Sequence, residues 1–135
     1  MKTKQYILKI SLVSAIFLLF AGFNSFAQEK WVAPESADKI TNPVKNDASA
    51  TASGKKLFNS LCSVCHGPKG RGDGMAGAGL TPKPANLSSE TVQAQSDGVL
   101  FWKLTEGRTP MPAYKTSIPE NKRWEIINYI RTLKK

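Results

Sequence analysis

The sequence predicts an all-α fold of three to four short helices joined by long loops. Apolar residues recur at helical spacing in three segments, which begin near residues 49, 96 and 119. No segment alternates apolar and polar residues with the period of two that a half-buried strand requires. The chain has 135 residues and no internal repeat, so we expect one small domain.

Residues 1–27 have the layout of a secretory signal peptide. A basic start, Met1–Lys4, precedes an uncharged apolar run, Ile10–Phe23, and small residues follow at Ser25 and Ala27. The run is shorter than the roughly 20 residues that span a bilayer. We therefore expect cleavage after Ala27 and a periplasmic protein; the alternative is an uncleaved anchor that associates with the membrane. Cleavage removes three lysines and no acid, which lowers the formal net charge from +9 to +6.

Residues 28–48 are rich in Pro, Ala, Asp, Lys and Asn and show no apolar period. We interpret them as an extended leader or linker before a domain at residues 49–135. The leader either lies over the domain through Trp31 or forms a flexible tail.

The first helix of the domain begins near Asp47 or Ser49, since either side chain can cap it. Gly54 lies inside this helix, where glycine costs about 1 kcal/mol relative to alanine. A glycine kept there indicates close approach of another backbone. The apolar positions of this helix are Leu57, Phe58 and Leu61.

A glycine-rich loop, Gly67–Gly79, follows and continues without regular structure through Pro84. It is not a phosphate-binding loop, because no strand precedes it and the Gly-Lys-Ser/Thr ending is missing. A short helix then starts at Ser96 or Asp97 and stops at Gly107.

A loop of alternating prolines surrounds Met111 before the last helix. That helix opens near Pro119–Glu120, where a proline and an acid both suit a helix start. Its apolar face consists of Trp124, Ile127 and Ile130.

The pentad Cys62-Ser63-Val64-Cys65-His66 predicts covalent attachment of one haem c. Two thiols three residues apart can bond the two vinyl groups of a haem, and the adjacent His66 then lies against the iron. A structural zinc site would need four ligands, whereas the chain has two Cys and one His. A redox dithiol would need a βαβ context, and a plain disulfide is the simplest remaining alternative.

The second iron ligand is predicted to be Met111, because the chain has no other histidine. Met75 lies only nine residues after His66, too soon to pass round the haem edge. Met111 lies between two prolines, which restrict the backbone and lower the entropy lost on ligation. The alternative is an ordinary core methionine. A His/Met pair fills both axial positions and raises the potential, which suits electron transfer.

With these residues in place, the sequence resembles the class I monohaem c-type cytochromes, in particular the small bacterial members. Gly54, Phe58 and the pentad match that family's first helix and haem motif, and Met111 matches its distal methionine. The resemblance covers residues 49–135. Further matches are Gly70–Gly74, Asp97–Gly98, Phe101–Trp102, Ile126 and Tyr129.

The resemblance implies that Ile126 and Tyr129 pack across Gly54 and Phe58. It also implies that a proline carbonyl accepts a hydrogen bond from the second ring nitrogen of the haem histidine. Pro82 and Pro84 are both candidates for that acceptor. Trp102 or Arg108 could contact a haem propionate, although simple core packing also explains Trp102.

Three functions remain in competition. The first is a monomeric, diffusible electron carrier whose basic surface meets acidic redox proteins, since an exported protein meets no nucleic acid. The second is a dedicated subunit of a larger oxidoreductase complex, tethered by residues 28–48. The third is a haem enzyme or gas sensor, which would need an open iron position. A basic rim for the first function could consist of Lys69, Lys83, Lys103 and Lys115.

Overall fold

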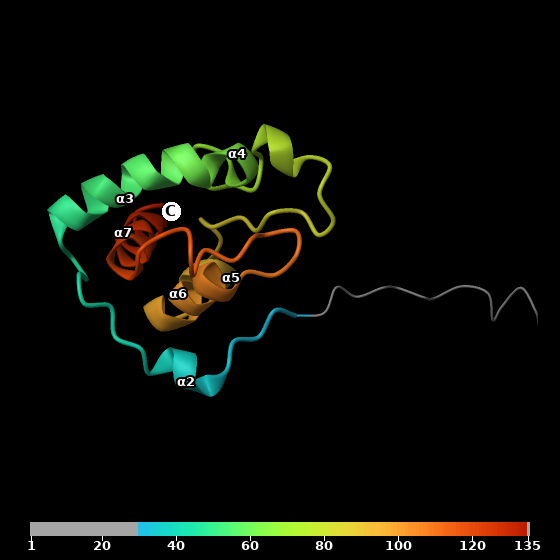
Figure 1. Ribbon diagram of the computed structural model, residues 1–135. Helices are drawn as coiled ribbons and strands as arrows, with labels where there is room; N and C mark the ends of the chain where they lie inside the picture. The colour runs from blue at the N-terminus through green and yellow to red at the C-terminus, as the bar shows by residue number, and fades with distance from the viewer. Residues whose placement is uncertain (1–29, 135) are drawn as a thin grey trace, which may run out of the picture. The chain divides into compact units, whose positions relative to one another are not determined.

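The computed structural model describes residues 30–134, so the predicted signal peptide lies outside the described residues. Within this part the protein has six α-helices, one 3₁₀ turn and no strand, which confirms the all-α prediction (Figure 1). No helix among the described residues is long and apolar enough to cross a membrane. The elements are α2 (Glu35–Asp38), α3 (Ala48–Leu61), α4 (Ser63–His66), η1 (Met75–Gly77), α5 (Glu90–Gln93), α6 (Asp97–Glu106) and α7 (Glu120–Arg131).

The three longer helices are the three that the sequence predicts. Asp47 caps α3 by accepting hydrogen bonds from the backbone N–H groups of Ser49 and Ala50, at 2.7 and 3.0 Å. Ser96 caps α6 in the same way, and Gly107 ends it. The one-turn helices α2, α4 and α5 are not predicted.

Helices α3 and α7 cross with their backbones in contact at Gly54. A Cβ atom at this position would overlap the carbonyl oxygen of Glu125 in α7. On either side of the contact, Phe58 and Ile126 are completely buried. The rings of Phe58 and Tyr129 lie 5.1 Å apart between centroids. The structure thus confirms the predicted packing of the last helix across Gly54 and Phe58.

Helix α6 packs on another side of α7, so that α7 lies between α3 and α6 (Figure 1). Phe101 of α6 stacks on Trp124 of α7 with 3.8 Å between ring centroids and planes 8° apart. Together the three helices enclose a single hydrophobic core that includes Cys62.

The leader from Trp31 onwards is folded against the helices, and α2 lies against α6 on the side away from α7 (Figure 1). Ala37 and Asn42 are both buried. The Asn42 amide donates to Asp97 of α6 at 2.9 Å and to Asn128 of α7 at 2.8 Å. Of the two alternatives for the leader, the described part therefore lies over the domain.

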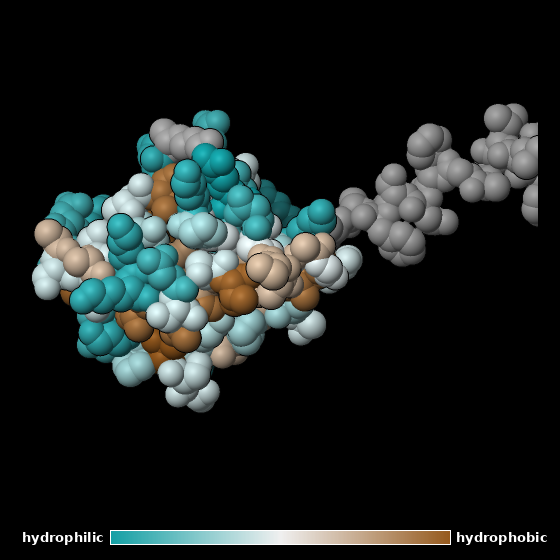
Figure 2. Space-filling view, turned by 90° about the horizontal axis from the view of Figure 1, so that it is seen from above, coloured by the Kyte–Doolittle hydropathy of each residue, from teal (hydrophilic) through white to brown (hydrophobic). Residues whose placement is uncertain are grey.

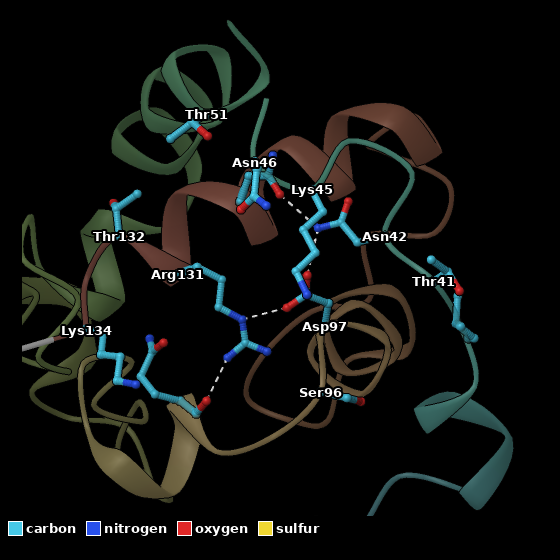
Figure 3. A pocket seen from close by; sticks show the side chains of 13 residues that line it. Thr41, Asn42, Lys45, Asn46, Thr51, Ser96, Asp97, Arg131, Thr132 and Lys134 are labelled. Carbon is cyan, nitrogen blue, oxygen red and sulfur yellow. Dashed lines mark hydrogen bonds and ion pairs between the residues drawn. The ribbon is translucent and has the colours of Figure 1, made fainter. Parts of the chain in front are cut away.

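A polar pocket of about 650 Å³ opens where the leader, α6 and α7 meet (Figure 3). Arg131 donates to Asp97 at 2.6 Å and also to the backbone carbonyls of Gln93 and Gln95. Hydrogen bonds among Asn42, Asp97 and Arg131, which line this pocket, thus join the leader to both helices.

Candidate haem site

The two cysteines of the pentad lie at the junction of α3 and α4. The N–H groups of Cys65 and His66 both donate to the carbonyl of Cys62, at 3.2 and 2.9 Å, so the segment forms one helical turn. Residues three apart share a face of such a turn. Both thiols are free. The turn therefore presents two unbonded thiols on one side of the chain.

The ionisation of Cys62 argues against a redox dithiol or a thiolate metal ligand. Burial and, to a smaller extent, the neighbouring Cys65 raise the pKa of Cys62 to about 12. Redox and metal-binding cysteines instead have lowered pKa values. No cluster of three or more His, Cys, Asp or Glu side chains that could hold a metal ion occurs in residues 30–134.

The ring of His66 is oriented by the carbonyl of Ala85, which lies 3.0 Å from Nδ1. A proton on Nδ1 donates to this oxygen and leaves the lone pair of Nε2 available for iron. Burial lowers the pKa of His66, and the hydrogen bond to Ala85 only partly opposes this shift. The imidazole is therefore neutral at pH 7, the form that binds metals.

The predicted acceptors for His66, Pro82 and Pro84, are both wrong. The carbonyl of Pro84 faces Gly72, since a Cβ atom on Gly72 would overlap its oxygen. The next carbonyl, that of Ala85, is the one turned toward the imidazole.

The glycine-rich loop closes over the end of α4. Gly72 donates to the carbonyl of His66 at 2.8 Å, and Gly74 donates to that of Cys65 at 3.1 Å. These bonds satisfy carbonyls that the end of a helix leaves without partners. The sequence predicts only an irregular loop here, because no local pattern shows which backbone groups it will meet.

The structure separates the two candidate methionines. Met75 is 93% exposed at the surface. Met111 is half-buried and packs against the hydrophobic core to which Cys62 belongs. Its backbone pairs with Arg108 through two hydrogen bonds of 3.0 and 2.8 Å, which close the Pro-rich loop into a tight turn.

Tyr114, three residues after Met111, reports how close this loop lies to the attachment cysteines. Burial raises the pKa of Tyr114, and its electrostatic interaction with Cys62 and Cys65 acts in the same direction. The Met111–Tyr114 segment and the pentad therefore border the same part of the core. Tyr114 is not among the residues that the sequence predicts for the site.

The predicted propionate contacts and the lysines of the predicted basic rim lie in other surroundings. Trp102 and Arg108 both contact the indole of Trp31, at 6.5 and 5.0 Å. Of the proposed basic rim, Lys103 donates to Gln95 at 2.6 Å, and Lys115 forms an ion pair with an acid of α6 at 3.6 Å. Lys69 and Lys83 are exposed.

A buried cation, Arg123 of α7, is absent from the sequence-based prediction. Only 6% of it is exposed, and its guanidinium lies 4.9 Å from the Phe101 ring centroid. It donates from Nη1 to Thr105 at 2.6 Å, while the buried Nε has no hydrogen-bond partner among the described residues. An arginine in the first turn of a helix is usually solvated, so the sequence carries no signal of its burial.

Apolar side chains are also exposed beside the pentad. Leu61, Val64 and Met75 are 40%, 54% and 93% exposed. On the face in Figure 2, hydrophobic residues reach the surface between hydrophilic ones. Two free thiols, a neutral oriented imidazole and a methionine at the core form a set of side chains that suits a c-type haem, so the residues present fit this cofactor.

Comparison with known proteins identifies a family and a shared fold. The family model for cytochrome c oxidase, cbb3-type, subunit III matches residues 49–130. Among solved structures, one chain of the reducing HAO-like protein complex of Kuenenia stuttgartiensis is similar at 23% identity and a TM-score of 0.61. The match covers 79% of this chain and 53% of that one, so this chain spans about half its length, and the likeness shows a shared fold. No curated protein matches the chain.

The family match spans nearly all of the predicted domain and includes Cys62, Cys65 and His66. It supports a cytochrome c domain with covalently bound haem and a role in electron transfer. Because the match covers more than half of the chain, the protein belongs to the family described as cytochrome c oxidase, cbb3-type, subunit III.

Proposed function

We propose that the protein carries single electrons through one c-type haem, bonded to Cys62 and Cys65, with His66 and Met111 as axial ligands. It works in the periplasm after removal of residues 1–27 and shuttles electrons between exported or membrane redox proteins. The observation that carries this proposal is the meeting of the Met111–Tyr114 segment and the pentad at one part of the core. The chain has two cysteines, enough to attach one haem.

Each residue has a distinct task in this proposal. A bound c-type haem supplies exchange between ferrous and ferric iron. Cys62 and Cys65 fix the cofactor, and the hydrogen bond to Ala85 holds the His66 ring in the tautomer that leaves Nε2 unprotonated. The thioether of Met111 would hold the iron as its second protein ligand, so that no ligand position would stay open for a substrate or gas.

The axial assignment is tested by carbon monoxide binding to the reduced holoprotein at neutral pH, followed by absorption. We expect no binding by the wild type and binding by Met111→Ala, because the substitution opens one iron position. Met75→Ala is the matched control and should behave as the wild type, since that side chain is 93% exposed. If wild type and Met111→Ala behave alike, Met111 is not the ligand; binding by the wild type would favour an enzyme or sensor.

A dedicated subunit of a larger oxidoreductase complex is the second candidate. The description of the family as an oxidase subunit and the presence of the similar solved chain in a protein complex favour it. Because residues 31–47 pack against the helices, a tether would have to lie before Trp31. Purification of the native protein distinguishes the two: a carrier elutes as a monomer, whereas a subunit co-elutes with its enzyme.

The basic charge of the chain supports acidic partners for the carrier. The formal charge is +6 after the proposed removal of residues 1–27, and Lys69 and Lys83 are exposed. Electron exchange with a carboxylate-coated electrode should slow steeply as ionic strength rises, because salt screens attraction between exposed charges. A rate that does not respond to salt would remove the steering argument.

A further inference from the structure

Trp31, in the leader, is a meeting point for side chains next to the Met111 loop. Its indole lies 6.5 Å from the Trp102 ring in an edge-to-face arrangement. The ammonium of Lys103 lies 5.5 Å from the ring centroid, and the guanidinium of Arg108 lies 5.0 Å from it. Both distances are within the range of cation–π attraction. The leader thus contacts α6, and Arg108 two residues beyond its end, through one aromatic side chain.

The leader is well anchored behind Trp31. Gly98 of α6 has no room for a side chain, because a Cβ atom would overlap the carbonyl oxygen of Ala37 and stand 2.7 Å from that of Ile40. Ser96 donates to Asp38 at 2.7 Å. Asn42 is held by both α6 and α7 (Figure 3). Because these contacts fix the leader to the helices, Trp31 lies at the start of a well-anchored segment.

Arg108 connects this contact to Met111. Its side chain lies against Trp31, while its backbone N–H and carbonyl form both hydrogen bonds of the turn that contains Met111. Any opening of the turn that carries Met111 away from the core therefore disturbs the residue that Trp31 contacts.

We propose that Trp31 is a positioning residue, which braces the Met111 turn through Arg108 and so slows the opening of the axial position held by Met111. This inference rests on the proposed ligation of iron by His66 and Met111. Of the two cation–π contacts of Trp31, only the one to Arg108 bears on the Met111 turn, and one such contact at an exposed site corresponds to about 2- to 5-fold in an opening equilibrium.

The test compares Trp31→Ala, Trp31→Phe and Val32→Ala in the oxidised holoprotein. Val32 is the matched control, because it is adjacent in the leader and 69% exposed. The first measurement is the rate at which imidazole displaces the methionine from ferric iron. The second is hydrogen exchange at the amide of Met111, with the amide of Phe58 in α3 as an internal reference.

We expect Trp31→Ala to raise the imidazole rate about 2- to 5-fold and to speed exchange at Met111 to a similar degree. Exchange at Phe58 should not change. Trp31→Phe, which retains a ring, should fall between alanine and the wild type, and Val32→Ala should match the wild type. If Trp31→Ala matches Val32→Ala, or speeds exchange at Met111 and Phe58 equally, the brace is wrong.

Failure of the proposed function is recognised separately. It would appear in the wild-type protein, as carbon monoxide binding to the reduced form and a missing iron–sulfur absorption band in the oxidised form. If the reduced wild type does not bind carbon monoxide and Trp31→Ala changes neither the imidazole rate nor exchange at Met111, only the role of Trp31 is overturned.

Discussion

Substitution of Gly54 by alanine tests whether contact between helix backbones holds the haem-bearing helix in place. The new Cβ atom would overlap the carbonyl oxygen of Glu125 and stand 3.0 Å from the backbone nitrogen of Ile126. Both atoms belong to the backbone of α7, so no side-chain rotation can relieve the overlap. Helix α3 must shift away from α7, and the shift carries along Cys62 at its C-terminal end.

The magnitude follows from two opposing effects. Alanine in place of glycine stabilises a helix interior by about 1 kcal/mol. Overpacking of a tight core costs about 1–3 kcal/mol, and the rigid contact here places Gly54→Ala at the upper end. We therefore expect a net loss of about 2 kcal/mol in the free energy of unfolding. In guanidinium chloride this corresponds to a midpoint about 0.3–1 M lower, measured on the holoprotein by circular dichroism.

Gly79→Ala is the matched control, because a Cβ atom at Gly79 would meet no atom within 4 Å. Its unfolding midpoint should stay close to that of the wild type. If Gly54→Ala unfolds at the same denaturant concentration as Gly79→Ala, the contact between α3 and α7 is not restrictive, and our explanation for the glycine is refuted.

Two further substitutions probe the polar groups. Partial burial alone would raise the pKa of Asp97, but hydrogen bonds from Asn42 and Arg131 outweigh it, so the pKa is lowered in the folded protein. Asp97 therefore stabilises the fold above its unfolded pKa, near 4, and this contribution is lost as pH falls through the folded pKa. Asp97→Asn should cost about 1–2 kcal/mol at pH 7 in urea unfolding and flatten the decline below pH 4; an unchanged pH profile would contradict this. Arg123→Met should leave stability within about 1 kcal/mol, because a buried charge is replaced by an apolar chain. It should also lower the reduction potential measured by voltammetry, since a cation disfavours ferric iron, and a raised potential would argue against this electrostatic role.

The sequence predicts the long helices well, because their signals are local. Asp47 and Ser96 each cap the first turn of the helix that follows them, and Gly107 ends α6. None of these predictions depends on residues distant in the sequence. Helices α2 and α5 have four residues each, too few to show a 3.6-residue period. Their positions depend on packing that no local pattern encodes.

The error over the partner of His66 has a different cause. Every residue has a carbonyl, so the identity of an acceptor depends on backbone direction and not on residue type. The direction at Ala85 is set by the way the segment from Pro82 meets Gly72 across the loop. The two cysteines and His66 could be predicted because covalent attachment demands particular side chains at fixed spacing.

The packing of the leader against the helices depends on contacts that its amino-acid composition does not reveal. Small and polar residues such as Ala37 and Asn42 usually indicate a linker, yet both are buried here. The sequence signal for this contact lies in α6 and not in the leader. Gly98 lies inside that helix, which implies close approach of a second backbone, as Gly54 does in α3.

The two sides of the proposed iron site are held by separate parts of the backbone. On one side, hydrogen bonds from the glycine-rich loop and to Ala85 fix the pentad and the ring of His66. On the other, the turn shared with Arg108 fixes Met111. Apart from His66 itself, neither group of hydrogen bonds involves a titratable side chain. Oxidation or reduction of the iron therefore causes no proton uptake or release in these hydrogen bonds. Backbone dipoles that are already in place need little rearrangement when charge moves, which is the property that rapid electron exchange requires.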